Sequence, residues 1–124
     1  MIELVIVIVI LGILAAVALP KFVDLKDDAR RASLISIAGT IKSASATNYA
    51  AKLAGKPSAI TVNQANVCTT AILGSLLTGG MPAGYSAIGP YVGDCSNTLV
   101  DVAGCEITDA QGGITATVGV VCAR

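Results

Sequence analysis

The first twenty residues are the feature that most constrains this chain. Leu4 to Leu19 form a run of sixteen residues without a charged or hydrogen-bonding side chain. Glu3 precedes the run, and Pro20 and Lys21 follow it. As a helix the run spans about 24 Å, slightly less than the roughly 30 Å hydrocarbon core of a bilayer. Because a lone segment in lipid must satisfy its own backbone, the run predicts a helix in a membrane or among other helices.

A helical pattern continues well beyond Pro20. Apolar residues recur at helical spacing and form one stripe: Leu34, Ile37, Ile41 and Ala44. Gly55 followed by Pro57 is typical of a helix end. The sequence therefore predicts one helix from about residue 2 to about residue 54, on the order of 80 Å long. Residues 1–20 would be its hydrophobic membrane or filament-core segment, and residues 21–54 its amphipathic continuation.

The second half of the chain predicts a small mixed domain. Residues 55–80 are expected to form a connector with a short strand at Ile60 to Val62 and a short helix over 68–77, capped by Asn66. Residues 81–124 are expected to form an antiparallel β head, in which the Gly- and Pro-rich stretch 81–90 is a loop.

A hairpin is the clearest β signal in this head. Strands are expected over 99–108 and 114–121, with a turn over 109–113. Alternation in the second strand places four apolar residues on one face, toward the long helix: Ile114, Ala116, Val118 and Val120. The fold class that results is α+β, a long N-terminal helix packed against a small antiparallel sheet.

Four cysteines, all in the second half, predict two disulfides and an oxidising compartment: Cys68, Cys95, Cys105 and Cys122. A turn centred near Gln111 and Gly112 places Cys122 opposite about Asp101, which disfavours Cys105–Cys122. We favour Cys95–Cys105 with Cys68–Cys122, and Cys68–Cys105 with Cys95–Cys122 remains open. A four-thiolate metal site is disfavoured because the usual Cys-x-x-Cys spacing is absent.

Charge and composition argue against enzymatic chemistry. The chain has no histidine, the commonest general base and metal ligand. We expect no catalytic residue, no cofactor and no metal. Residues 1–56 hold seven basic and four acidic side chains, a net +3, whereas residues 57–124 hold one and four, a net −3. A basic stalk and an acidic head would complement each other between copies. Two solvated faces explain the same charges equally well.

The N-terminal motif resembles that of type IV pilins and the related pseudopilins. Met1-Ile2-Glu3-Leu4 is similar to a mature pilin that lacks its first two residues, Phe-Thr. Gly12 and Pro20 stand at the distances from the glutamate that are usual in the family, and the ALPKF continuation is common there. The resemblance implies the pilin fold, cleavage of a leader by a prepilin peptidase, and methylation of the new N-terminus.

The resemblance also implies roles for three filament-assembly residues. Glu3 would pair with the N-terminal amine of a neighbouring subunit, because a carboxylate buried among apolar helices is costly without a partner. The helix would unwind locally between Gly12 and Pro20 in the filament, since proline weakens a helix interior.

The function implied is structural rather than enzymatic. The chain would polymerise with itself into an extracellular type IV pilus on a bacterial cell surface. Before assembly by the pilus machinery, the subunit would be held in the inner membrane. Adhesion, twitching motility and DNA uptake are not distinguished, and no nucleic-acid partner is predicted. The alternatives are a type II secretion pseudopilin, a minor pilin acting as adhesin or DNA receptor, and an unrelated membrane-held protein.

Overall fold

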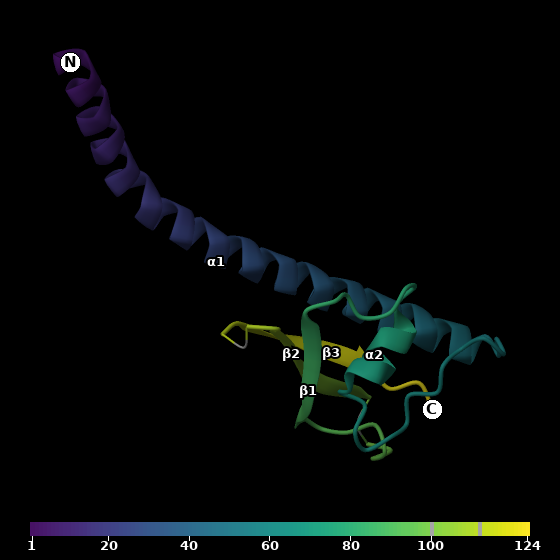
Figure 1. Cartoon of the computed structure of the whole chain (residues 1–124). Coiled ribbons are helices and arrows are strands. Elements are labelled where there is room, and N and C mark those ends of the chain that lie inside the picture. The colour runs from purple at the N-terminus through teal and green to yellow at the C-terminus, as the bar shows by residue number, and fades with distance from the viewer. Residues whose placement is uncertain (100, 112) are drawn as a thin grey trace. The chain divides into compact units, whose positions relative to one another are not determined.

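The computed structural model describes residues 1–99, 101–111 and 113–124. These residues form two compact units, 1–30 and 31–124. The elements along the chain, shown in Figure 1, are α1 (Ile2–Leu53), α2 (Thr70–Leu76), β1 (Tyr85–Val92), β2 (Val102–Asp109) and β3 (Thr115–Val121). The predicted long N-terminal helix and the α+β class are confirmed.

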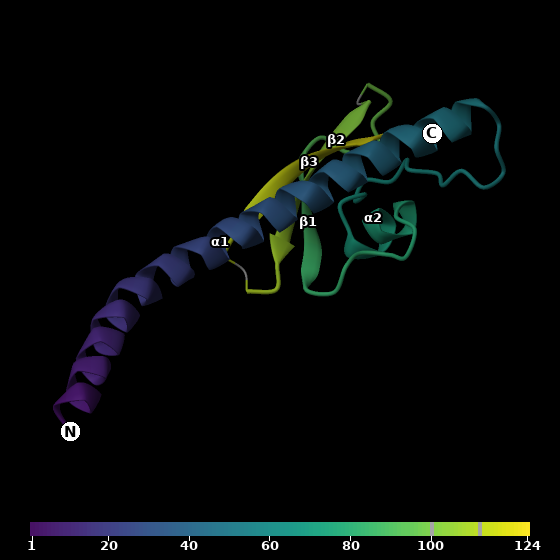
Figure 2. The same cartoon turned by 90° about the horizontal axis from the view of Figure 1, so that it is seen from above.

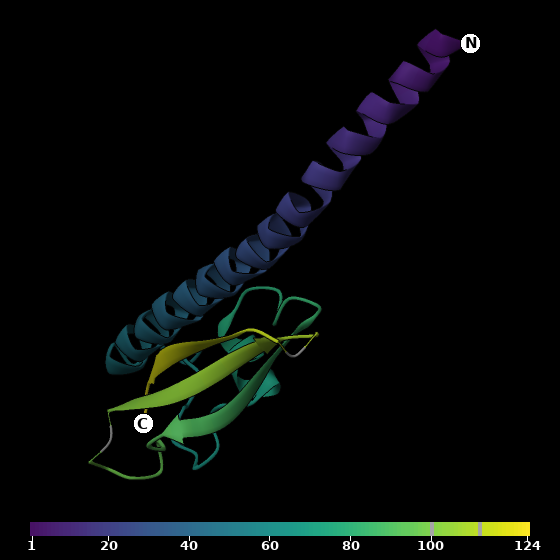
Figure 3. The same ribbon diagram turned by 90° about the vertical axis from the view of Figure 1, so that its left-hand side faces the viewer.

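The three strands form one antiparallel sheet in the order β1-β2-β3, visible in Figure 3. In the β2–β3 hairpin Val102 lies opposite Val121, and Thr108 lies opposite Thr115. Cys122 donates its backbone N–H to the carbonyl of Asp101 at 2.9 Å, so the predicted register of this hairpin is confirmed. Val100 and Gly112, which belong to the predicted strand and turn, lie outside the described residues.

Residues 31–53 of α1 cover the sheet within the second unit, and Figure 2 shows this part of the helix alongside β3. The core draws on every layer of the unit, with fully buried Leu34 and Ile41 from α1, Leu73 from α2, Ile107 from β2 and Val120 from β3. Val118 is also buried, as predicted for that face of β3.

Two of the four buried positions of α1 lie one residue after the positions that the apolar stripe predicted. Leu34 and Ile41 are buried as expected, but their companions are Ala38 and Ser45, whereas Ile37 and Ala44 are only half-buried. Alanine and serine are small enough to let the sheet approach the helix closely, and apolar periodicity alone does not distinguish such positions from their neighbours.

Strand β1 contradicts the loop predicted over 81–90. Its sequence YSAIGPYV contains a glycine and a proline, which normally interrupt strands. β1 lies at one edge of the sheet. An edge strand has one side without a neighbouring strand, so a proline that lacks its N–H on that side removes no hydrogen bond from the sheet. The pairing with β2 is also irregular between Ile88 and Val92, which is the signature of a bulge, and Gly89 has a φ of +135° there.

Two smaller expectations are corrected in the connector. The short helix begins at Thr70 with Thr69 as its N-cap, rather than at Cys68 with Asn66 as the cap. The Thr69 hydroxyl accepts the backbone N–H of Ile72 at 3.2 Å. The strand predicted at Ile60 to Val62 is reduced to one bridge between Val62 and Ala123.

Candidate assembly site

The apolar segment Leu4–Leu19 is a continuous exposed surface on α1. Its large side chains are all at least half exposed, from Ile10 at 51% to Val17 and Leu19 at 66%. By length and composition α1 is the one helix, within the part of the chain that the structure describes, that can cross a membrane. So much contiguous exposed apolar surface requires lipid or other protein as its surroundings.

Glu3 lies in the first turn of α1. It is the one charged side chain among residues 1–20. A carboxylate at this place is favoured by the partial positive charge of the helix N-terminus, by about 0.3–1 kcal/mol. That contribution is smaller than the cost of burying an unpaired carboxylate, so Glu3 would need a cation from outside the helix wherever this segment is buried among apolar neighbours.

Gly12 and Pro20 both lie inside α1, which continues through them. A Cβ added at Gly12 would meet no atom within 4 Å, so contacts within this chain do not require glycine there. Pro20 has no N–H to donate to the carbonyl four residues before it, which leaves one backbone acceptor of α1 without its helical partner. Unwinding between the two positions is an expectation for the filament and remains a prediction.

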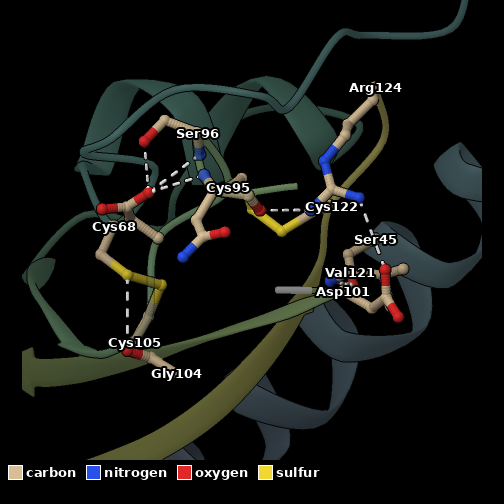
Figure 4. The surroundings of a disulfide bond; sticks show 12 residues. Ser45, Cys68, Cys95, Ser96, Asp101, Gly104, Cys105, Val121, Cys122 and Arg124 are labelled. Carbon is tan, nitrogen blue, oxygen red and sulfur yellow. Dashed lines mark hydrogen bonds and ion pairs between the residues drawn. A yellow bond between two sulfur atoms is a disulfide. The ribbon is translucent and has the colours of Figure 1, made fainter. Parts of the chain in front are cut away.

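The two disulfides are Cys68–Cys105 and Cys95–Cys122, each with a Cα–Cα distance of 5.3 Å (Figure 4). The favoured pairing, Cys95–Cys105 with Cys68–Cys122, is therefore wrong, and the alternative that was left open is the one observed. Sheet register supplies the reason. Val92 lies opposite Gly104, so the chain leaving β1 runs toward Asp101, beside which Cys122 is hydrogen-bonded.

The loop after β1 is organised by Asp94. Its carboxylate accepts hydrogen bonds from the Ser96 hydroxyl and from the backbone N–H groups of Ser96 and Asn97. The Ser96 hydroxyl bond is the largest cause that holds the pKa of Asp94 below its ordinary value; desolvation raises the pKa, and the two backbone bonds lower it further. Arg124 closes the loop from the C-terminus by donating to the carbonyl of Asn97 at 2.6 Å and to Asp101 at 3.4 Å (Figure 4).

We expect the Asp94 loop to loosen only below the pH at which an ordinary aspartate titrates. Because the pKa in the fold is depressed, the carboxylate stabilises the fold above the ordinary value of 3.8 and loses this effect as pH falls through the lower folded value. The amide resonances of Ser96 and Asn97, followed by NMR, should therefore titrate with a midpoint below 3.8, and Asp94→Asn should remove the transition. A midpoint at or above 3.8 would contradict this assignment.

Ser45 is a structural residue that the sequence prediction missed. Its side chain is fully buried on the sheet-facing side of α1. The hydroxyl donates to the carbonyl of Lys42 at 2.9 Å and accepts the backbone N–H of Val121 at 3.3 Å, which joins α1 to β3. A serine within a helical stripe gives no signal in the sequence that the backbone N–H of a strand residue lies opposite it.

Replacing Ser45 by alanine should destabilise the fold by about 1–3 kcal/mol, because the N–H of Val121 would lose its acceptor in a partly buried place. Denaturant unfolding of the detergent-solubilised chain measures this. Ser33→Ala is the matched control, since Ser33 is exposed on the same helix, and its effect should lie within about 0.5 kcal/mol. Equal effects of the two variants would refute the assigned role of Ser45.

Asn48 makes a second polar contact between α1 and the rest of its unit. Its amide donates to the carbonyl of Ile60 at 2.7 Å and accepts the N–H of Ile60 at 2.8 Å, so the side chain imitates a paired strand residue. Among the described residues, no three His, Cys, Asp or Glu side chains gather where they would hold a metal ion.

A long helix with an apolar N-terminal segment, a small antiparallel sheet and two disulfides is the fold of the type IV pilins. The comparison with curated proteins gives a particular relative, the type IV narrow pilus major component PilA5 of Thermus thermophilus. The chain is 54% identical to it over 44 residues, which cover 36% of this chain and 38% of the relative. The match thus spans well under half of either protein, and the resemblance to type IV pilins is confirmed. No protein-family model and no solved structure matches the chain.

Proposed function

We propose that this chain is a structural subunit that polymerises through α1 into an extracellular type IV pilus. The observation that carries the proposal is the exposed apolar segment Leu4–Leu19 with Glu3 at its head. The pilin fold and the likeness to a narrow-pilus major component support it. In this function the segment is held by the inner membrane before assembly and by the corresponding segments of neighbouring copies afterwards.

Glu3 directs the docking step in this proposal. The Glu3 carboxylate needs a cation when it leaves water and lipid headgroups for the apolar fibre. That cation is the ammonium group at the mature N-terminus of another subunit, either one already in the fibre or the incoming one. Pairing two charges while apolar helices pack favours one axial register over sliding alternatives. Gly12 and Pro20 then give the packed helix a weak stretch at which the fibre can extend.

The proposed partners are other copies of this chain, a prepilin peptidase and the pilus assembly machinery, and the proposed location of the polymer is the bacterial surface. The experiment is removal of the chain from its host, followed by electron microscopy of sheared surface fibres and restoration with the unaltered sequence. We expect fibres to disappear and return, and antibody to the head to label them along their length. Fibres that persist without the chain, or labelling at the tip alone, would overturn a major-subunit role.

A further inference from the structure

The two edges of the head sheet differ in what happens to their outward backbone groups. In an antiparallel sheet, successive residues of an edge strand direct their N–H and C=O groups alternately toward the neighbouring strand and away from the sheet. An outward row of such groups is a template for another strand unless something occupies or interrupts it. β1 forms one edge of this sheet and β3 forms the other (Figure 3).

The edge along β1 is closed. The N–H of Ala87 points away from β2 and is bonded to the hydroxyl of Thr70, the first residue of α2, at 3.1 Å. The N–H of Tyr85 is bonded to the carbonyl of Pro82 at 3.3 Å. Farther along the strand, the irregular pairing with β2 and the missing N–H of Pro90 interrupt the row. β1 therefore offers no regular row of groups to a further strand.

The edge along β3 is open over most of its length. The N–H of Val121 points away from β2 and is bonded to the hydroxyl of Ser45 on α1 at 3.3 Å, so α1 occupies this end of the edge. By alternation, the backbone groups of Thr115, Thr117 and Gly119 also point outward. In the described part of the chain, the N–H and C=O groups of these three residues have no hydrogen-bond partner on this side. Both threonines are exposed.

The sequence of β3 contains nothing that would block an approaching strand. Natural edge strands are commonly protected by a charged side chain, a proline or a bulge. The strand TATVGVV has neither a charge nor a proline. Its pairing with β2 is regular throughout, from Thr115 opposite Thr108 to Val121 opposite Val102. The edge is therefore both open and flat enough to accept another strand.

We propose that the open edge of β3 pairs in antiparallel orientation with the β3 edge of a second copy, a contact that rests on the proposed polymer function. A second copy has no other open edge in its sheet, because β1 is closed. The row is also self-complementary. With Thr117 opposite its counterpart, Thr115 lies opposite Gly119 of the second copy, and about six N–H···O=C bonds form. No like charges face each other in this pairing, because β3 carries none.

The symmetry of this contact places it between fibres. Pairing of one strand with its own copy uses the same patch on both heads, so it is a two-fold contact that closes on two subunits. A fibre grows instead by a head-to-tail contact that repeats without closing. The β3 contact therefore joins heads of two different fibres, and many such contacts along their length add up to stable side-by-side association.

The first test is amide hydrogen exchange in purified fibres of the unaltered chain, kept dispersed or allowed to associate side by side. The fibres are then dissolved under quench conditions and read by NMR. We expect the N–H groups of Thr115, Thr117 and Gly119 to exchange at least about tenfold more slowly in associated fibres than in dispersed ones. Those of Ala116 and Val118, which pair with β2, should exchange equally slowly in both samples.

Three results of this experiment would overturn the contact. The outward N–H groups could already be protected in dispersed fibres, which would mean that another surface of the same fibre covers the edge. They could stay unprotected in associated fibres, which would mean that the fibres associate elsewhere. Purified fibres that do not associate without a further protein would show that a second copy is not the partner of this edge.

Variants at Thr117 test the same contact independently. Thr117→Pro removes an outward N–H but no bond to β2, so the solubilised subunit should stay folded while the fraction of bundled fibres, counted by electron microscopy, falls at least about tenfold. Thr117→Val keeps the N–H and the branched shape and should bundle normally. Thr117→Lys replaces the proline variant if that one does not fold, because an edge lysine opposes strand pairing. Normal bundling of the folded variant refutes the contact and leaves the pilus function intact, whereas an unaltered chain that forms no fibres refutes that function.

Discussion

Replacing Glu3 by alanine should reduce surface fibres at least about a hundredfold while leaving the subunit in the membrane. In the proposed fibre, the variant would remove the carboxylate and leave the N-terminal ammonium of the neighbouring subunit without its partner in an apolar assembly. Removing one member of a buried ion pair costs about 3–5 kcal/mol, which corresponds to more than a hundredfold in an association constant. Quantitative immunoblotting of the sheared-fibre and inner-membrane fractions measures both parts of the result.

Two further variants make this result specific to the charge. Glu3→Gln keeps the size and hydrogen-bonding capacity of the side chain but not its charge, and it should behave like alanine. Asp24→Ala removes a charge from the same helix beyond the apolar run, and it should leave the fibres at normal levels. Normal piliation in Glu3→Ala would show that the carboxylate does not pair with a cation during assembly.

Removing the Cys68–Cys105 disulfide should destabilise the head by roughly 4 kcal/mol. The bond closes a long segment, since its cysteines are separated by 37 positions, and the chain-entropy relation gives this magnitude at 25 °C. Both sulfurs belong to buried residues, so the double variant Cys68→Ala with Cys105→Ala is preferable to serine, which would bury two hydroxyls. Denaturant unfolding of the solubilised, non-reduced chain gives the measurement.

The second disulfide provides the comparison. Cys95→Ala with Cys122→Ala opens a segment of 27 positions and should cost roughly 3.5 kcal/mol. The first variant should therefore lower the free energy of unfolding slightly more than the second. A loss below about 1 kcal/mol in both variants would show that the disulfides contribute little to the stability of the head.

The parts of the fold that the sequence predicted depend on local patterns. The sixteen-residue apolar run and the stripe through Leu34 and Ile41 are periodic over many residues, so they indicate the helix without knowledge of its neighbours. The β2–β3 hairpin was likewise predictable in register, because its strands are close in sequence and its turn fixes the pairing.

The parts that were missed depend on contacts between distant segments. Strand β1 contains Gly89 and Pro90, and only its place at a sheet edge with an irregular register makes it a strand. The pairing of Cys95 with Cys122 follows from the position of β1 beside β2, so an error about β1 led to an error about the disulfides. Ser45 gave no signal because its partner, the N–H of Val121, lies 76 positions away.

The most direct test of the central claim, that this chain is the disulfide-bonded subunit of a surface pilus, is an intact mass measured without reduction. The sample is the protein in fibres sheared from the cell surface. We expect the chain to be present in these fibres and its mass to increase by four hydrogens when the same sample is reduced, two for each disulfide. Absence of the chain from the fibres, with the protein still in the inner membrane, would contradict the account.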